Sequence, residues 1–189
     1  SLPGLTNLSP SGVAFNQRQD INITANVTDN TNVSVVRANI TQPAGDSVIV
    51  TLIQSSTDIF NATYADADQL GNYTLQYLAN DTSDNVNDSS IIYFRVNDSH
   101  APNVTSVASA PTTGDQGATF NISAVVIDNA NISQVFMNIT GPGTGVYLQM
   151  RNVSSTYNEL FNTTTSTAAG IWTATIYAND TSGLINRTA

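Results

Sequence analysis

The chain contains two copies of one sequence, 99 residues apart, and this repetition constrains its fold more than any other feature. Residues 71–83 read GNYTLQYLANDTS, and residues 170–182 read GIWTATIYANDTS. Residues 3–43 align with residues 102–142 at the same offset without a gap, whereas the middle of each copy diverges. The sequence therefore predicts two homologous domains in tandem, over residues 1–98 and 99–189.

Each copy of this motif alternates apolar and polar residues, which is the period of a β-strand with one buried face. The residues expected on the buried face are Tyr73, Leu75, Tyr77 and Ala79 in the first copy, and Trp172, Ala174, Ile176 and Ala178 in the second. Similar runs predict seven strands in the first domain, near residues 4–8, 20–28, 34–41, 47–53, 57–64, 72–80 and 90–96. This pattern is typical of an all-β, immunoglobulin-like β-sandwich, and two small barrels are the alternative that periodicity leaves open.

The composition supports an all-β chain and excludes some classes of partner. There is one glutamate, no lysine and no cysteine, and the formal net charge is −9. Nucleic acids and anionic lipids bind clustered basic residues, so neither is an expected partner. No apolar run has the ~20 residues needed to cross a bilayer, so we expect no membrane insertion in this segment.

Asparagine occurs mainly in glycosylation sequons. Eighteen of the 23 asparagines begin an Asn-x-Ser/Thr sequence, whereas the Ser and Thr content would place about five there by chance. We therefore predict N-linked glycans and an extracellular location; the frequency of Asn and Thr in turns is the alternative. Seventeen of these eighteen, all except Asn7, are the candidate acceptors: Asn22, Asn26, Asn32, Asn39, Asn61, Asn72, Asn80, Asn87, Asn97, Asn103, Asn121, Asn131, Asn138, Asn152, Asn162, Asn179 and Asn186. Outward-facing strand positions favour Asn22, Asn39, Asn121 and Asn138.

Several segments together carry a family resemblance. DINITANVTDN at 20–30, VVRANITQP at 35–43, the motif at 71–83 and IYFRV at 92–96 resemble the Ig-like repeats of archaeal cell-surface proteins. The resemblance implies tandem sandwiches on secreted, N-glycosylated chains, and it implies no particular activity. One turn departs from the family, with Asp84-Asn85 and Gly183-Leu184 where Gly-Asn is usual.

Residues for catalysis are scarce, and we expect no enzyme. The single histidine, His100, falls in the predicted linker, and cysteine and lysine are absent as nucleophiles or bases. Asp66 and Asp68 are a pair of carboxylates in a variable segment, which is typical of solvated loop residues. No set of residues converges on a reaction.

A calcium site is a second hypothesis. Asp29 and Asp81 recur as Asp128 and Asp180, and the linker at 96–102 resembles the calcium-binding linker of cadherins. Carboxylate oxygens suit Ca²⁺, so Asp98, Asp128 and Asp180 are the candidate ligands at the interdomain junction. Aspartate at strand ends also caps turns, and this alternative explains the pattern without a metal.

The second repeat suggests how copies could assemble. Its strand-face positions 136 and 177 hold Phe136 and Tyr177, where the first repeat has Arg37 and Leu78. The strand at 90–96 would recur from about position 190, so we expect the second sandwich to lack its last strand and to expose Trp172 in an apolar groove. Either another copy donates the strand, or the sequence is a piece of a longer tandem array in which the strand follows.

These sequence features support two hypotheses for the function of the chain. The first is a structural subunit of a surface filament, stalk or sheath, whose partners are other copies of itself, joined by strand exchange or end-to-end contacts. The alternative is an adhesin or ligand-binding module in a longer tandem array, in which neighbouring repeats are the partners.

Overall fold

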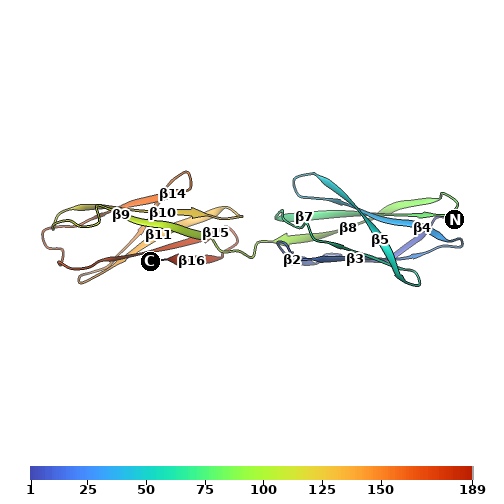
Figure 1. Ribbon diagram of the computed structural model, residues 1–189, viewed down its shortest axis with the longest axis horizontal. Helices are drawn as coiled ribbons and strands as arrows, with labels where there is room; N and C mark the ends of the chain where they lie inside the picture. Colours follow the sequence, from blue (N-terminus) through green and yellow to red (C-terminus); the bar gives the residue numbers. More distant parts are fainter. Residues whose placement is uncertain (189) are drawn as a thin grey trace. The chain divides into compact units, whose positions relative to one another are not determined.

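The structure is a computed structural model that describes residues 1–188, which form β-strands and connecting turns (Figure 1). Two compact units divide the chain, Ser1–Asp98 and residues 99–189. Within the described part of the chain, no helix is long and apolar enough to cross a membrane.

The first unit is a sandwich whose two layers share one strand. Its strands are β1 (Gly4–Ser9), β2 (Ala14–Asn16), β3 (Ile21–Thr28), β4 (Val33–Thr41), β5 (Ser47–Ser56), β6 (Ile59–Tyr64), β7 (Gly71–Asp81) and β8 (Val86–Asn97), paired in the order β1-β3-β6-β5-β4-β7-β8-β2. Strand β5 pairs with β4 through residues 47–52 and with β6 through residues 53–56, so it crosses between the layers (Figure 1).

The second unit has two separate four-stranded sheets. Their orders are β13-β14-β10-β9 and β12-β11-β15-β16. The strands are β9 (Asn103–Ala110), β10 (Thr119–Ile127), β11 (Ile132–Thr140), β12 (Val146–Gln149), β13 (Arg151–Val153), β14 (Thr156–Asn162), β15 (Thr173–Asp180) and β16 (Ile185–Thr188). The counterpart of β5 is divided into β12 and β13 at Met150, whose side chain is buried in the core.

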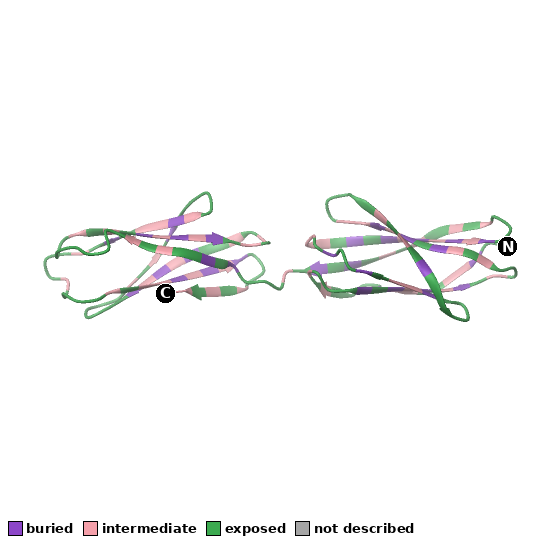
Figure 2. Cartoon of the chain, in the orientation of Figure 1, coloured by how far each residue is buried: buried purple, intermediate pink, exposed green. Residues whose placement is uncertain are grey.

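Alternation along the strands builds both cores, and buried positions recur at every second residue (Figure 2). In the first unit, Tyr73 stacks on Phe94 with ring centroids 4.8 Å apart, and Phe15 meets Phe94 edge-on at 5.6 Å. Each unit therefore encloses an apolar core of its own, as a two-layer β architecture requires.

The seven strands predicted for the first domain all form, with two differences. Strand β2, which pairs in parallel with β8 over three residues, was not predicted, because residues 14–16 are too few to show a period. Strand β8 begins at Val86 and not near residue 90. Its first half pairs with β7 through the backbone but carries exposed polar residues, so the sequence shows no apolar period there.

The early start of β8 corrects the prediction that the second sandwich lacks its last strand. Position 185 is the counterpart of position 86, and β16 begins there. Strand β16 pairs with β15 only at residues 176–179. The first part of β15, at residues 173–175, pairs with β11 on one side and has no described partner strand on the other.

Candidate functional site

A groove of about 970 Å³ lies beside the first half of β15 in the second unit. Aromatic and aliphatic side chains form much of its floor, notably those of Phe120, Phe161 and Trp172. Ile171 stands at the groove with its side chain 88% exposed. Such exposure of a large apolar residue beside an apolar groove is typical of a surface that another segment covers.

The first unit shows what occupies the homologous position. There β8 lies between residues 71–75 of β7, with which it is antiparallel, and β2, with which it is parallel. At an offset of 99 these flanking segments correspond to residues 170–174 and 113–115, and both line the groove. The groove therefore coincides with the place of the second half of β8.

Burial confirms this correspondence. Three core positions are fully buried in the first unit, whereas their counterparts, which line the groove, are half-buried in the second. These pairs are Ile21 with Phe120, Tyr73 with Trp172, and Leu75 with Ala174. Positions that do not line the groove, such as Val36 and its counterpart Val135, are buried in both units.

Trp172 is held at one edge of the groove by close contacts. Its indole nitrogen donates to the carbonyl of Ala168 at 3.2 Å, and its ring lies 5.4 Å from that of Phe161. A methyl group at Gly141 would lie only 2.4 Å from the indole, so glycine permits the ring to lie against the backbone. The indole thus has a fixed orientation with its edge in the groove.

A row of aromatic rings covers the outer face of the sheet β12-β11-β15-β16. Phe136 stacks on Tyr147 with centroids 5.1 Å apart and an interplanar angle of 18°, and Tyr147 lies 6.1 Å from Tyr177. Phe136 and Tyr177 are half-buried by this packing, whereas Tyr147 is 58% exposed. Tyr147 was not predicted, because it falls in the segment where the repeats diverge.

The recurring aspartates form a hydrogen-bonded cluster in the first unit. The Asp81 Oδ1 atom accepts from the backbone amides of Ser83 and Asn85, and its Oδ2 atom accepts from Asn85 Nδ2 at 2.7 Å and Thr31 Oγ1 at 3.3 Å. Thr31 also donates to Asp29. The bonds from Asn85 lower the pKa of Asp81, and the bonds from Thr31 hold the pKa of Asp29 at about 2.

The second unit brings Asp128 and Asp180 together at the homologous place, with carboxylate oxygens within 4.8 Å of each other. Asp180 is 2% exposed, and its Oδ1 atom accepts from the backbone amides of Ser182 and Leu184. Asp98 directly follows β8, in the segment that leads to the second unit.

Every predicted glycan acceptor has some exposed surface. The exposed ones are Asn22, Asn32, Asn72, Asn97, Asn103, Asn121, Asn131, Asn152 and Asn162, and the half-buried ones are Asn26, Asn39, Asn61, Asn80, Asn87, Asn138, Asn179 and Asn186. Two of the half-buried amides have structural bonds, since Asn87 Nδ2 donates to the Pro3 carbonyl and Asn186 Nδ2 to the Pro102 carbonyl, each at 2.8 Å.

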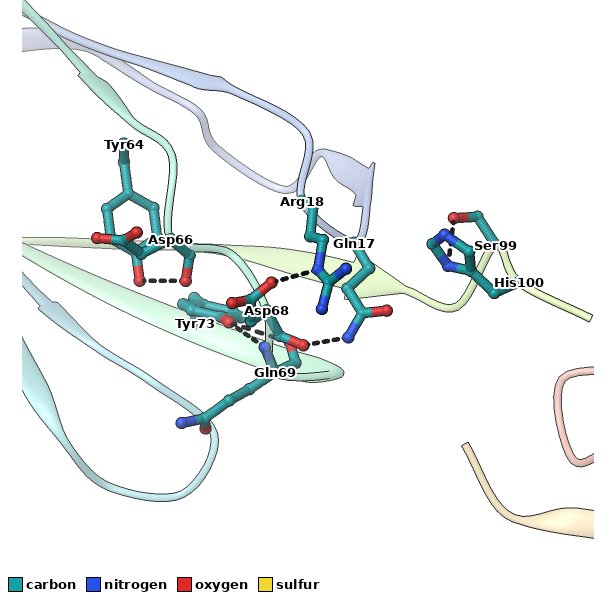
Figure 3. Close-up of polar contacts among 9 residues, drawn as sticks. All are labelled: Gln17, Arg18, Tyr64, Asp66, Asp68, Gln69, Tyr73, Ser99 and His100. Carbon is teal, nitrogen blue, oxygen red and sulfur yellow. Dashed lines mark hydrogen bonds and ion pairs between the residues drawn. The ribbon is translucent and has the colours of Figure 1, made fainter. Parts of the chain in front are cut away.

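The carboxylates considered for catalysis belong to a loop network in the first unit (Figure 3). Arg18 Nε donates to Asp68 Oδ1 at 2.9 Å, and both side chains are exposed. The Tyr64 hydroxyl donates to the Asp66 carbonyl at 3.0 Å. The His100 Nδ1 atom lies 3.5 Å from Ser99 Oγ. The contacts of Arg18 and Tyr64 hold the loop between β6 and β7, whereas the His100 contact is local to the segment after β8.

Comparisons with known proteins define the fold class. No family model and no curated protein matches the sequence. The structure is similar to a segment of titin at 11% identity, with 98% of this chain and 94% of that one covered and a TM-score of 0.50. Similarity extends to a tetra-tandem repeat in the extending region of a large adhesion protein (20% identity, 99% and 48% covered, TM-score 0.49).

The fibronectin(III)-like modules of Clostridium thermocellum CbhA are also similar, at 18% identity, with 98% and 90% covered and a TM-score of 0.39. At these identities the likeness concerns the fold. The chain consists of two tandem immunoglobulin-like β-sandwich domains, as the sequence predicts.

Proposed function

We propose that this chain is a glycosylated structural module of an extracellular surface, in a filament, stalk or sheath, and that the groove of its second unit accepts a β-strand from another copy. The groove carries this proposal, because the same protein shows in its first unit which element fits there. The resemblance to archaeal surface repeats and the abundance of sequons support an archaeal cell surface as its location.

The chemistry of the groove matches one kind of occupant. In the first unit, Phe94 and Val96 of β8 are buried, while Tyr93 and Arg95 between them face solvent. An incoming strand with apolar residues at alternate positions would cover Phe120, Phe161 and Trp172 in the same manner. Its backbone would complete the hydrogen-bond ladder of residues 173–175, as strand addition does at other open sheet edges.

A strand donated from one copy to the next would produce an open-ended assembly. Donor strand and acceptor groove would be different surfaces, so the contact would be heterologous. Such contacts form filaments when the rotation between copies does not close a ring. A glycosylated exterior suits such a polymer, because sugars on outward strand faces leave the groove free.

Association of the 189-residue chain tests this proposal. Sedimentation should show oligomers that grow with protein concentration, and a peptide with the sequence of residues 91–97, IIYFRVN, should reduce them by occupying the groove. Trp172 is the only tryptophan, so a blue shift of its emission should accompany peptide binding.

The matched control is the peptide ISYSRSN, in which the three core-facing residues are serine. It should neither shift the emission nor reduce association. If association is independent of concentration, or if both peptides act alike, strand addition from another copy is wrong.

Glycan occupancy should follow the structure. We expect Asn22 and Asn121, exposed on β3 and β10, to carry sugar in protein from its native source. Asn87 and Asn186 should be bare, because a glycan on Nδ2 would disturb their bonds to proline carbonyls. Glycopeptide mass spectrometry measures all four sites, and sugar on the second pair but not on the first would contradict this prediction.

The aromatic row favours a second candidate, an adhesin or ligand-binding module. The rings of Phe136, Tyr147 and Tyr177 present a partly exposed apolar face of the kind that binds a protein surface or a sugar ring. An adhesive module would bind its target through this face whether or not the groove peptide is present. The peptide experiment therefore separates the two candidates.

A further inference from the structure

The two repeats differ in how they satisfy one buried carboxylate. Asp81 and Asp180 are counterparts, are 1% and 2% exposed, and accept the same two backbone amide bonds through Oδ1. The other oxygen distinguishes them. Asp81 Oδ2 accepts two side-chain bonds, whereas Asp180 Oδ2 is buried with no hydrogen-bond partner among the described residues.

Two substitutions between the repeats cause this difference. The donors to Asp81 are Thr31 and Asn85, and at an offset of 99 their counterparts are Ala130 and Leu184. Neither alanine nor leucine has a side-chain donor. A buried carboxylate oxygen without a partner is costly, so a group absent from the protein atoms is expected there.

The surroundings of this oxygen indicate a cation. The Asp128 carboxylate lies within 4.8 Å of the Asp180 carboxylate. Two carboxylates this close repel each other, and a positive ion between them removes the repulsion. Ca²⁺ holds its oxygen ligands at about 2.4 Å, so two ligands of one ion lie up to about 5 Å apart, which matches the observed separation.

We propose that Asp128 and Asp180 bind Ca²⁺ at the β9 end of the second unit. Asn103 pairs with Ile127, and the Pro102 carbonyl accepts from Asn186, so the first strand of this unit begins beside Asp128. The first unit satisfies its own buried carboxylate with Thr31 and Asn85, so we expect no ion at that place.

Calorimetric titration of the whole chain with CaCl₂ tests the site. One Ca²⁺ should bind with a dissociation constant of about 10⁻⁴ to 10⁻³ M, the range of extracellular calcium modules. At about 10 mM CaCl₂ the unfolding midpoint followed by Trp172 emission should rise by about 5 °C or more. The absence of both binding and a shift would overturn the proposal.

Variants assign the ligands. Asp128→Asn and Asp180→Asn should each weaken Ca²⁺ binding on the order of tenfold or more. Asp29→Asn, the matched change in the first unit, should leave the titration unchanged. Unchanged affinity in Asp128→Asn would refute the site even if Asp180→Asn fails to fold.

A double variant tests the reason for the site. Ala130→Thr with Leu184→Asn transfers the donors of the first unit to Asp180. This variant should fold without Ca²⁺ at least as stably as the wild type, and its Ca²⁺-dependent shift in midpoint should be largely lost. If the Ca²⁺-dependent shift in midpoint persists at its wild-type size, the unpartnered Asp180 Oδ2 atom is not the cause of Ca²⁺ binding.

Discussion

Replacing Phe94 by alanine is expected to lower the free energy of unfolding of the first unit by about 3–5 kcal/mol. The ring is 1% exposed, stacks on Tyr73 and contacts Phe15, so its removal leaves a cavity that these side chains cannot fill. In a domain of this size the unfolding midpoint should fall by more than about 10 °C. Calorimetry should show one unfolding transition for each unit, and the transition of the first unit should move to a lower temperature.

The adjacent residue supplies the control. Tyr93 lies on the same strand with its side chain 66% exposed, so Tyr93→Ala should change stability by less than about 0.5 kcal/mol. The transition reported by Trp172 belongs to the second unit and should be unaffected by either change. A loss below about 1 kcal/mol in Phe94→Ala would show that β8 is not essential to the core, and the argument from β8 to the groove would fail.

Much of this fold could be predicted because the strands that form the cores alternate strictly. Tyr73, Leu75 and Tyr77 are buried as their period indicates, and the repeat transfers the same assignment to the second unit. Strands held mainly by backbone pairing were harder to predict. The short strand β2 and the polar first half of β8 show no apolar period, because little of their surface enters a core.

The candidate sites depend on substitutions between the repeats. The sequence shows these substitutions, but only the structure shows which contacts they remove. The sequence shows alanine at position 130 and leucine at 184, but their importance depends on the bonds that Thr31 and Asn85 make to Asp81. The aspartates themselves could be predicted from their recurrence. Tyr147 could not, because the repeats diverge there and no counterpart indicates its role.

The groove and the proposed calcium site lie at opposite ends of β15. Trp172 immediately precedes this strand, and Asp180 is its last residue. Ca²⁺ would fix the turn between β15 and β16, while an added strand would complete the ladder at the start of β15.

The largest effect on association is expected when the strand that fits the groove is supplied within the same chain. Extending the chain after Ala189 with Ile-Ile-Tyr-Phe-Arg-Val-Asn, the sequence of residues 91–97, should fill the groove from within one copy. In this register the extension continues from the counterpart of Ser90 and places its isoleucine, phenylalanine and valine where Ile92, Phe94 and Val96 lie in the first unit. Concentration-dependent association should then disappear, because the acceptor surface is occupied.

The unfolding midpoint of the extended variant is a second test of whether the added strand occupies the groove. At concentrations too low for association, the midpoint of the second unit should rise by about 8 °C or more, the shift expected for a gain of about 2 kcal/mol, comparable with burial of one large apolar side chain. Extension with Ile-Ser-Tyr-Ser-Arg-Ser-Asn is the control and should leave both association and midpoint unchanged. If the apolar extension stabilises the second unit but association persists, the groove accepts a strand and yet is not the contact between copies, and the aromatic row around Tyr147 becomes the surface to test.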